Sequence, residues 1–227
     1  MFFHLASTLL SRFNVYRQPE DIKSSIKYFR FLRINFHSLK AYNILHGELT
    51  SRLVQALAES LVLGSGDMIQ EMEEMVTLIP EVLAWDVSTD ARRQAITAFT
   101  HVTKTEMFRR KHTQPAADRV IQILREATVL KPDSHASYAF ASCLAARFET
   151  MHVIDDYDEA ITIADKIVAA HSPGDSLTKT QTDTVMLISI LLVSRLNSYS
   201  RPEYLEDAIH RIHTFVPCLQ KDRKSVV

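Results

Sequence analysis

Residues 137–161 read SYAFASCLAARFETMHVIDDYDEAI and contain the pattern that decides the fold. The first half is an apolar run that ends in Arg147-Phe148, and the second half starts with acids and continues through Tyr157 to Ile161. Apolar residues that recur three or four positions apart lie on one face of a helix. Two such segments joined by a short polar connection predict a helical hairpin.

The same pattern recurs along the chain. In three places an arginine is followed by a Phe or Leu that lies 13 residues before an isoleucine, and the three pairs are Arg12-Phe13, Arg147-Phe148 and Arg195-Leu196. Five apolar stripes with i, i+4, i+7 spacing lie at intervals of 46, 52, 37 and 48 residues: Ile22, Ile26, Phe29; Met68, Met72, Met75; Val120, Leu124, Ala127; Tyr157, Ile161, Ala164; and Leu205, Ile209, Ile212. Intervals of this size predict an array of repeated helical units.

Each unit is predicted to contain two helices. The first, termed helix A, is apolar around much of its circumference, and the second, termed helix B, carries the stripe and is more plainly amphipathic. This difference is expected when helix A lies between neighbouring units and helix B faces outward. The small residues Ala6, Ala141 and Ser189 in helix A should let two helix backbones approach closely.

The prolines fit this segmentation. Pro19, Pro115 and Pro202 are predicted to start helix B, where the missing N–H is harmless. The other four are predicted to follow the end of a helix B and to stop it: Pro80, Pro132, Pro173 and Pro217.

The recurring arginines are predicted to have a structural role. They are expected in the last turn of helix A, near its negative end, while acids open helix B near its positive end. The arginines are Arg12, Arg147 and Arg195, and the acids are Glu20-Asp21, Asp155-Asp156 and Glu203. A shared ligand site is the alternative, and dipole pairing is favoured over it.

Composition supports an all-α fold. Only 4 of the 227 residues are glycine, fewer than an all-β chain with frequent tight turns requires. We therefore predict an α-α superhelix of about five helical hairpins in a single domain over residues 1–227. The expected units are residues 1–34, 49–79, 90–129, 135–171 and 179–216.

Cysteine and hydropathy patterns favour a cytoplasmic protein. Cys143 and Cys218 form neither a disulfide framework nor a metal-ligand spacing, so a reducing compartment is expected. The most apolar window, Val185–Val193, is too short to cross a membrane and is interpreted as a buried helix.

Charge alternates along the chain although the net charge is −1. The segments 1–52, 53–91, 92–133 and 134–227 carry +5, −8, +5 and −3. Alternation is compatible with neighbouring units that attract one another and equally with partner binding. The near-neutral balance disfavours an extended nucleic-acid surface.

The quoted stretch resembles degenerate tetratricopeptide repeats of the long kind found in large fungal proteins, often upstream of a caspase-like CHAT domain. The residues that carry the resemblance are Ser137–Phe148 with Tyr157-Asp-Glu-Ala-Ile161, and Arg195-Leu196 with Leu205-Glu-Asp-Ala-Ile209. The units lack the W-x-x-L-G-x-x-Y opening of the 34-residue repeat. The resemblance implies a helical-repeat binding protein that is part of a longer array or a shortened relative of one.

Catalytic signatures are not found in the sequence. The four glycines permit neither a phosphate-binding loop nor a dinucleotide motif nor a nucleophile elbow. Gly64-Ser65-Gly66 is interpreted as a hairpin connection that ends one helix and caps the next. His210 and His213 share a helix face but lack a third ligand, and Cys143 lies within an apolar helix.

The function predicted from the sequence is a non-catalytic protein–protein interaction scaffold with a concave helical-repeat surface, without cofactor or metal. The basic run Arg109, Arg110 and Lys111 is the candidate partner-binding site, although charge runs are more often solvated surface. The methionine stripe and Trp85 are interpreted as core. Two alternatives stay open: a helical ligand-binding regulator or enzyme with an inter-helix pocket, and a helical-repeat RNA binder.

Overall fold

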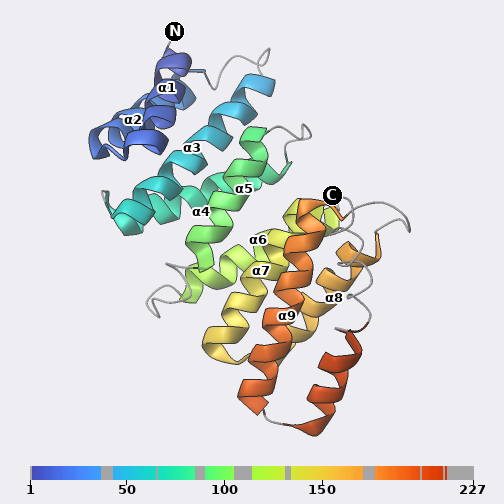
Figure 1. The fold of residues 1–227 in the computed structure, drawn as a ribbon. Helices are drawn as coiled ribbons and strands as arrows, with labels where there is room; N and C mark the ends of the chain where they lie inside the picture. Colours follow the sequence, from blue (N-terminus) through green and yellow to red (C-terminus); the bar gives the residue numbers. More distant parts are fainter. Residues whose placement is uncertain are drawn as a thin grey trace. The chain divides into compact units, whose positions relative to one another are not determined.

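The computed structural model describes residues 2–36, 43–64, 66–84, 90–104, 114–130, 134–170, 177–199, 201–211 and 213. These residues form an all-α fold in which neighbouring helices pack in pairs, and no strand occurs among them. The labelled helices are α1 (Phe2–Tyr16), α2 (Pro19–Phe36), α3 (Asn43–Leu63), α4 (Met68–Ala84), α5 (Asp90–Val102), α6 (Gln114–Leu130), α7 (Ser134–Met151), α8 (Ile154–Ala169) and α9 (Lys179–Tyr199). A further helix covers residues 202–211 (Figure 1).

The chain divides into two compact units, residues 1–131 and residues 132–227, where the sequence predicted a single domain. The first unit contains α1 to α6, and the second contains α7, α8, α9 and helix 202–211. Each unit is described by itself.

In the first unit, α3 is the helix that most clearly lies between neighbours. It packs against α1, α2, α4 and α5. Nearly every α3 side chain from Leu49 to Leu61 is buried, and only Arg52 and Glu59 in that stretch are half-buried. Such a helix needs apolar residues on most of its circumference, which is the property predicted for helix A.

The amphipathic stripes of the first unit form its core. Ile22, Ile26 and Phe29 of α2 are buried, as are Met72 and Met75 of α4 and Val120 and Leu124 of α6. Burying a side chain of this size contributes about 1.5–3 kcal/mol, so a stripe of three accounts for much of the docking of one helix. The side chains of Met68 and Ala127 lie outside the described residues.

A close helix crossing joins α1 to α2. Ala6 of α1 is fully buried, and the hydroxyl of Ser25 on α2 donates a 2.9 Å hydrogen bond to the Ala6 carbonyl. A larger side chain at position 6 would separate the two backbones. The predicted close approach at this small residue is confirmed.

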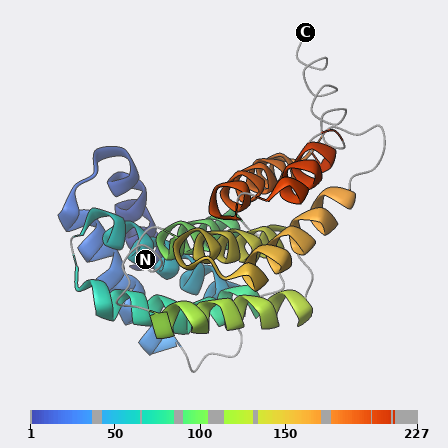
Figure 2. The same cartoon turned by 90° about the horizontal axis from the view of Figure 1, so that it is seen from below.

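In the second unit, α7 and α8 form a pair and both pack against α9. Figure 2 shows α9 and helix 202–211 running side by side. Tyr157, Ile161 and Ala164 of α8 are buried, as predicted for their stripe, and so is Cys143 of α7, which behaves as a small apolar residue.

One proline prediction is wrong. Pro80 lies inside α4 and does not follow its end. Proline cannot donate the N–H bond to the carbonyl four residues earlier, which costs about 3 kcal/mol in a helix interior. The packing of Val82 and Leu83, which are buried beyond the proline, outweighs that cost. Pro19 and position 202 do begin helices, whereas Pro132, Pro173 and Pro217 lie outside the described residues.

The last hairpin also differs from its prediction. Leu205 and Ile209 of the expected fifth stripe are exposed, and Ala208 is the buried residue of helix 202–211. Ser189, expected at a close crossing, is exposed as well. The window Val185–Val193, interpreted as buried, has one buried face and one open face in α9. No described helix packs on that open side, so these side chains remain in solvent.

Candidate functional site

Two of the recurring arginines bind a buried carboxylate inside their own hairpin. Arg147 donates from Nε and Nη2 to the two carboxylate oxygens of Asp156, both at 2.6 Å. Arg12 makes the equivalent two-bond contact with Asp21, with Nε to Oδ2 at 2.6 Å. The hydrogen bonds from Arg12 lower the pKa of Asp21, which outweighs the opposing effect of desolvation. We call this contact between helix A and helix B of one hairpin the hairpin junction. In both hairpins the aspartate lies nine residues after the arginine.

The structural role predicted for these arginines is therefore confirmed for Arg12 and Arg147, but its physical basis is different. The arginines lie one turn before the end of helix A, since α1 extends to Tyr16 and α7 to Met151. They contribute two-bond ion pairs to the hairpin junction and not a charge at the helix end.

The fifth hairpin fills the same junction with an aromatic ring. Tyr204 takes the place of the aspartate, nine residues after Arg195, and the guanidinium of Arg195 lies 3.7 Å from its ring centroid. Tyr157 of α8 lies on the guanidinium at 4.4 Å, and Asp207 is 3.8 Å away. Stacking between two rings places this arginine across two successive hairpins.

The second hairpin has an acid without an arginine at the corresponding junction. Glu71 of α4 is buried, and its Oε1 accepts a 3.2 Å hydrogen bond from the hydroxyl of Ser60 on α3. Its Oε2 has no hydrogen-bond partner among the described residues. Desolvation raises the pKa of Glu71, and the nearby charge of Arg30 opposes that rise only in part.

The connection before α4 acts as a hairpin turn, as predicted for Gly64-Ser65-Gly66. Gly64 ends α3 with a φ of +68°, and Asp67 caps α4 by accepting the backbone N–H groups of Ile69 and Gln70, both at 3.1 Å. Position 65 lies outside the described residues. A Cβ at Gly66 would lie 2.1 Å from Oε1 of Glu71, so the buried acid rests directly on this glycine.

The same left-handed turn ends two other A helices without glycine. Arg17 after α1 has φ 54°, and His152 after α7 has φ 56°. Their N–H groups bind the carbonyls of Phe13 and Phe148, each at 2.7 Å. Non-glycine residues adopt this conformation at a cost, so both turns are held in place by the hairpins around them.

Ion pairs connect consecutive hairpins in the first unit. Arg17 binds Glu59 at 2.7 Å, Arg30 binds Glu74 with Nε to Oε2 at 3.0 Å, and Arg33 binds Glu81 at 2.6 Å. The basic first segment and the acidic second segment therefore attract one another directly. This is one of the two explanations that the alternating charge had left open.

The second unit repeats this arrangement with the sign reversed. Asp165 of α8 binds Arg211 of helix 202–211 at 2.6 Å. Asp165 lies 135 residues after Arg30, the same offset that separates Arg147 from Arg12. Tyr199 of α9 adds a 2.9 Å hydrogen bond to the carbonyl of His152. One position of helix B thus carries the inter-hairpin ion pair in both units.

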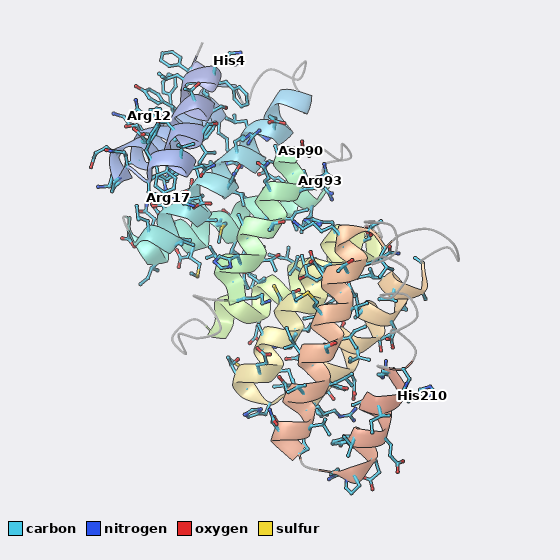
Figure 3. The ribbon with its side chains drawn as sticks, viewed as in Figure 1. His4, Arg12, Arg17, Asp90, Arg93 and His210 are labelled. Carbon is cyan, nitrogen blue, oxygen red and sulfur yellow. The ribbon has the colours of Figure 1, made fainter. Side chains whose placement is uncertain are left out.

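A polar surface remains open on the A helices of the first unit, and we call it the helix A surface. Its members are Glu48, Arg52 and Glu59 of α3 and Asp90, Gln94, Thr97 and His101 of α5, whereas Gln55 of α3 is buried and accepts a 3.3 Å hydrogen bond from Arg52. Arg52 joins the two helices by a 3.1 Å bond from Nη1 to Oε1 of Gln94, and it also binds Glu48 at 3.2 Å. Figure 3 shows Asp90 with Arg93 at the start of α5.

The candidate residues named from the sequence are brought together only in part. Arg109, Arg110, Lys111 and Trp85 lie outside the described residues. His210 and His213 are exposed at the last described helix, and the described part of the chain holds no group of three metal-binding side chains. None of its helices is long and apolar enough to cross a membrane.

Comparison with known proteins gives no assignment: no family model, curated protein or solved structure matches this chain.

Sequence reasoning missed the partners of several charged residues. The pairing of Arg12 with Asp21 and of Arg147 with Asp156 could have been found from the repeated spacing of nine. Glu59, Glu74 and Glu81 could have been found from the charge alternation, because they lie 42 to 48 residues after their arginines. The helix A surface had no sequence signal, since it depends on which sides of α3 and α5 stay uncovered.

Proposed function

We propose that this chain is a non-catalytic protein–protein interaction module whose helix A surface binds a peptide or a partner domain. The observation that carries the proposal is that α3 is buried on almost every side yet keeps partly exposed charged side chains in a line at positions 48, 52 and 59. Neighbouring helices cover the apolar positions of α3, so the side chains in this line need not be apolar. Helical-repeat arrays use such extended surfaces for binding.

The chemistry of the helix A surface favours a polar partner. Glu48, Glu59 and Asp90 supply carboxylates, Arg52 supplies a cation, and Gln94 supplies an amide. Amides and carboxylates in a row suit an extended backbone, because both accept from peptide N–H groups and the amides also donate to peptide C=O groups. We also propose that the hairpins are tetratricopeptide-like and that the protein works in a reducing, cytoplasmic compartment, where the free Cys143 persists.

Selection from a random peptide library on the full chain tests the function. Peptides that survive selection are measured by fluorescence anisotropy against the wild type, Arg52→Glu and the control Lys27→Glu. Lys27 is exposed on α2 and is not a member of the helix A surface. We expect Arg52→Glu to weaken binding by about tenfold or more, as loss of a central charged group does, while Lys27→Glu leaves it unchanged.

Circular dichroism must show that Arg52→Glu and Lys27→Glu have the same helix content. A second variant, Gln94→Ala, removes the partner of Arg52 on α5 without adding charge and should weaken binding in the same direction. Selected peptides that bind Arg52→Glu and Gln94→Ala as tightly as the wild type would contradict the proposal.

A further inference from the structure

The helix A positions of α1 and α9 match one another along the sequence with an offset of 183 residues. Ser11-Arg12 corresponds to Ser194-Arg195, and Tyr16 corresponds to Tyr199. The apolar residues Leu5 and Leu9 correspond to Ile188 and Leu192. The first and last described A helices therefore carry related side chains at the same positions.

These two helices bury opposite faces. In α1 the buried residues are Ala6, Leu10 and Phe13, on the side packed by α2 of the same hairpin and, over a smaller contact, by α3 of the next. The corresponding residues in α9 are Ser189 and Val193, which are exposed, and Leu196, which is half-buried. The side of α9 that would meet a following hairpin is open.

The reverse holds for the other face. In α9 the residues Val185, Ile188, Leu191 and Leu192 are buried in a unit where α9 packs on α7 and α8. Their counterparts in α1 are more exposed: Leu5 is 41% exposed against 0% for Ile188, and Phe2 is 44% exposed against 4% for Val185. The Phe2 ring also contacts Tyr28 and Phe31 of α2, and Leu9 is half-buried. The side of α1 that would meet a preceding hairpin is open.

Two complementary surfaces follow from this comparison. We call the first the head face, formed by Phe2, Leu5, Thr8 and Leu9 of α1. We call the second the tail face, formed by Met186, Ile190 and Val193 of α9 with Leu205 and Ile209 of helix 202–211. Leu205 is 51% exposed, although its counterpart Tyr157 in the preceding hairpin is 1% exposed.

We propose that two copies of this chain associate head to tail, with the head face of one copy on the tail face of the next. The contact continues an interface that the protein already contains, because α1 would pack as α9 packs on α7 and α8. Apolar side chains on both faces leave water in the process. This second-copy interface is separate from the helix A surface.

Polar residues of α1 also favour a second copy of the chain as the partner of the head face. In α9, Arg195 stacks on Tyr157, Tyr199 binds the carbonyl of His152, and Ser194 binds Glu149 at 3.3 Å, all on the preceding hairpin. The corresponding Tyr16 is 68% exposed, and the side chain of Arg12 is 57% exposed although its guanidinium binds Asp21 of its own hairpin. α1 thus keeps the polar docking residues of an internal helix A beside its apolar head face.

Such an interface is heterologous, since different surfaces meet, and it leaves a free head and a free tail on every complex. Association should therefore grow with concentration and should not stop at a dimer. Sedimentation velocity of the full chain from about 1 µM to about 1 mM covers the range in which weak complexes form. We expect a continuous increase of weight-average mass.

Two single variants give the decisive mixture. Leu5→Asp blocks the head and Val193→Asp blocks the tail, each by placing a charge in an apolar contact, and each alone should be monomeric where the wild type associates. Mixed together, they should form a 1:1 dimer and nothing larger, because one intact head meets one intact tail. Ile69→Asp is the matched control, because Ile69 is exposed and lies outside both faces. This variant should associate as the wild type does.

Thermal unfolding must show that all three variants are folded, which is expected because each substituted side chain is exposed. A wild type that stays monomeric to about 1 mM overturns the proposal, and hydrogen exchange would then show whether residues 214–227 protect the tail face instead. Association that survives both Leu5→Asp and Val193→Asp, or a mixture that grows beyond a dimer, also overturns it.

Discussion

The first and second hairpins contain an acid at the same junction, and only the first supplies it with a counter-charge. Asp21 receives two bonds from Arg12 and its pKa is lowered, whereas Glu71 receives one bond from Ser60 and its pKa is raised. The fourth hairpin follows the first, with Arg147 on Asp156. The comparison teaches that the junction tolerates loss of the ion pair as long as the acid keeps some contact.

The largest effect is expected from Arg147→Met. The side chain of Asp156 is 3% exposed, and that of Arg147 is 16% exposed, so the variant leaves a buried carboxylate without its cation. Breaking a buried pair in this way costs about 3–5 kcal/mol. Urea unfolding followed by circular dichroism should show the loss.

Arg12→Met is the matched variant in the first hairpin. The side chain of Arg12 is 57% exposed, so water can replace it at Asp21 more readily, and a smaller loss is expected. Equal losses for the two variants would show that burial does not set the strength of this junction.

Gly66→Ala should have the next largest effect. The new methyl group would meet Oε1 of Glu71, so the acid or the loop must move, at a cost of about 1–3 kcal/mol. The double variant Gly66→Ala with Glu71→Ala should recover much of that cost if the clash is the cause. Chemical denaturation of the four proteins in this cycle measures the coupling, and additive losses would contradict the contact.

Glu71→Gln should stabilise the protein at neutral pH by roughly 1 kcal/mol, because it removes a buried charge that lacks a full set of partners. Since the folded pKa of Glu71 is raised, its contribution favours folding below the unfolded pKa and is lost as the pH rises through the folded pKa.

Unfolding free energies of wild type and Glu71→Gln from pH 4 to pH 8 measure that contribution. Their difference should grow with pH across the window just above the ordinary glutamate pKa. Asp21 has the opposite sign, because its lowered pKa favours folding at higher pH and its contribution is lost on acidification. A constant difference between the two proteins would contradict the role of Glu71.

The smallest effect is expected from Arg17→Gly. Glycine relieves the positive φ of 54° but adds freedom to the unfolded chain, and the exposed pair with Glu59 is lost. These contributions nearly cancel, so a change within about 0.5 kcal/mol is expected in thermal unfolding. The reverse change at the matching turn, Gly64→Ala, should cost about 1 kcal/mol because it only adds strain.

The sequence predicts most of the helix pairing because apolar periodicity records which side of each helix is covered. It does so where the repeat is regular, as at Ile22, Ile26 and Phe29, whose burial is confirmed. It fails at Pro80, where packing on both sides outweighs a local helix breaker, and at Leu205, whose pattern implies a neighbour that no described helix provides.

The junctions show the same limit. Arg12 and Asp21 are visible as a spacing of nine, but Ser60 and Glu71, which make the contact in the second hairpin, are eleven apart, and the connection through Gly64 and Gly66 is longer. Without the arginine and with a changed spacing, the second junction cannot be predicted from the repeat. The helix A surface is likewise decided by three-dimensional coverage and not by a motif.

The ion pairs that connect successive hairpins join residues only 42 to 48 positions apart. Contacts of this reach close small loops, which favours fast folding compared with chains that must join distant segments. Each hairpin can find its partner as soon as the next one has been synthesised, without waiting for the rest of the chain. A weak junction inside one hairpin, such as the one at Glu71, then affects that hairpin and its docking on its immediate neighbours, and not the pairing of distant segments.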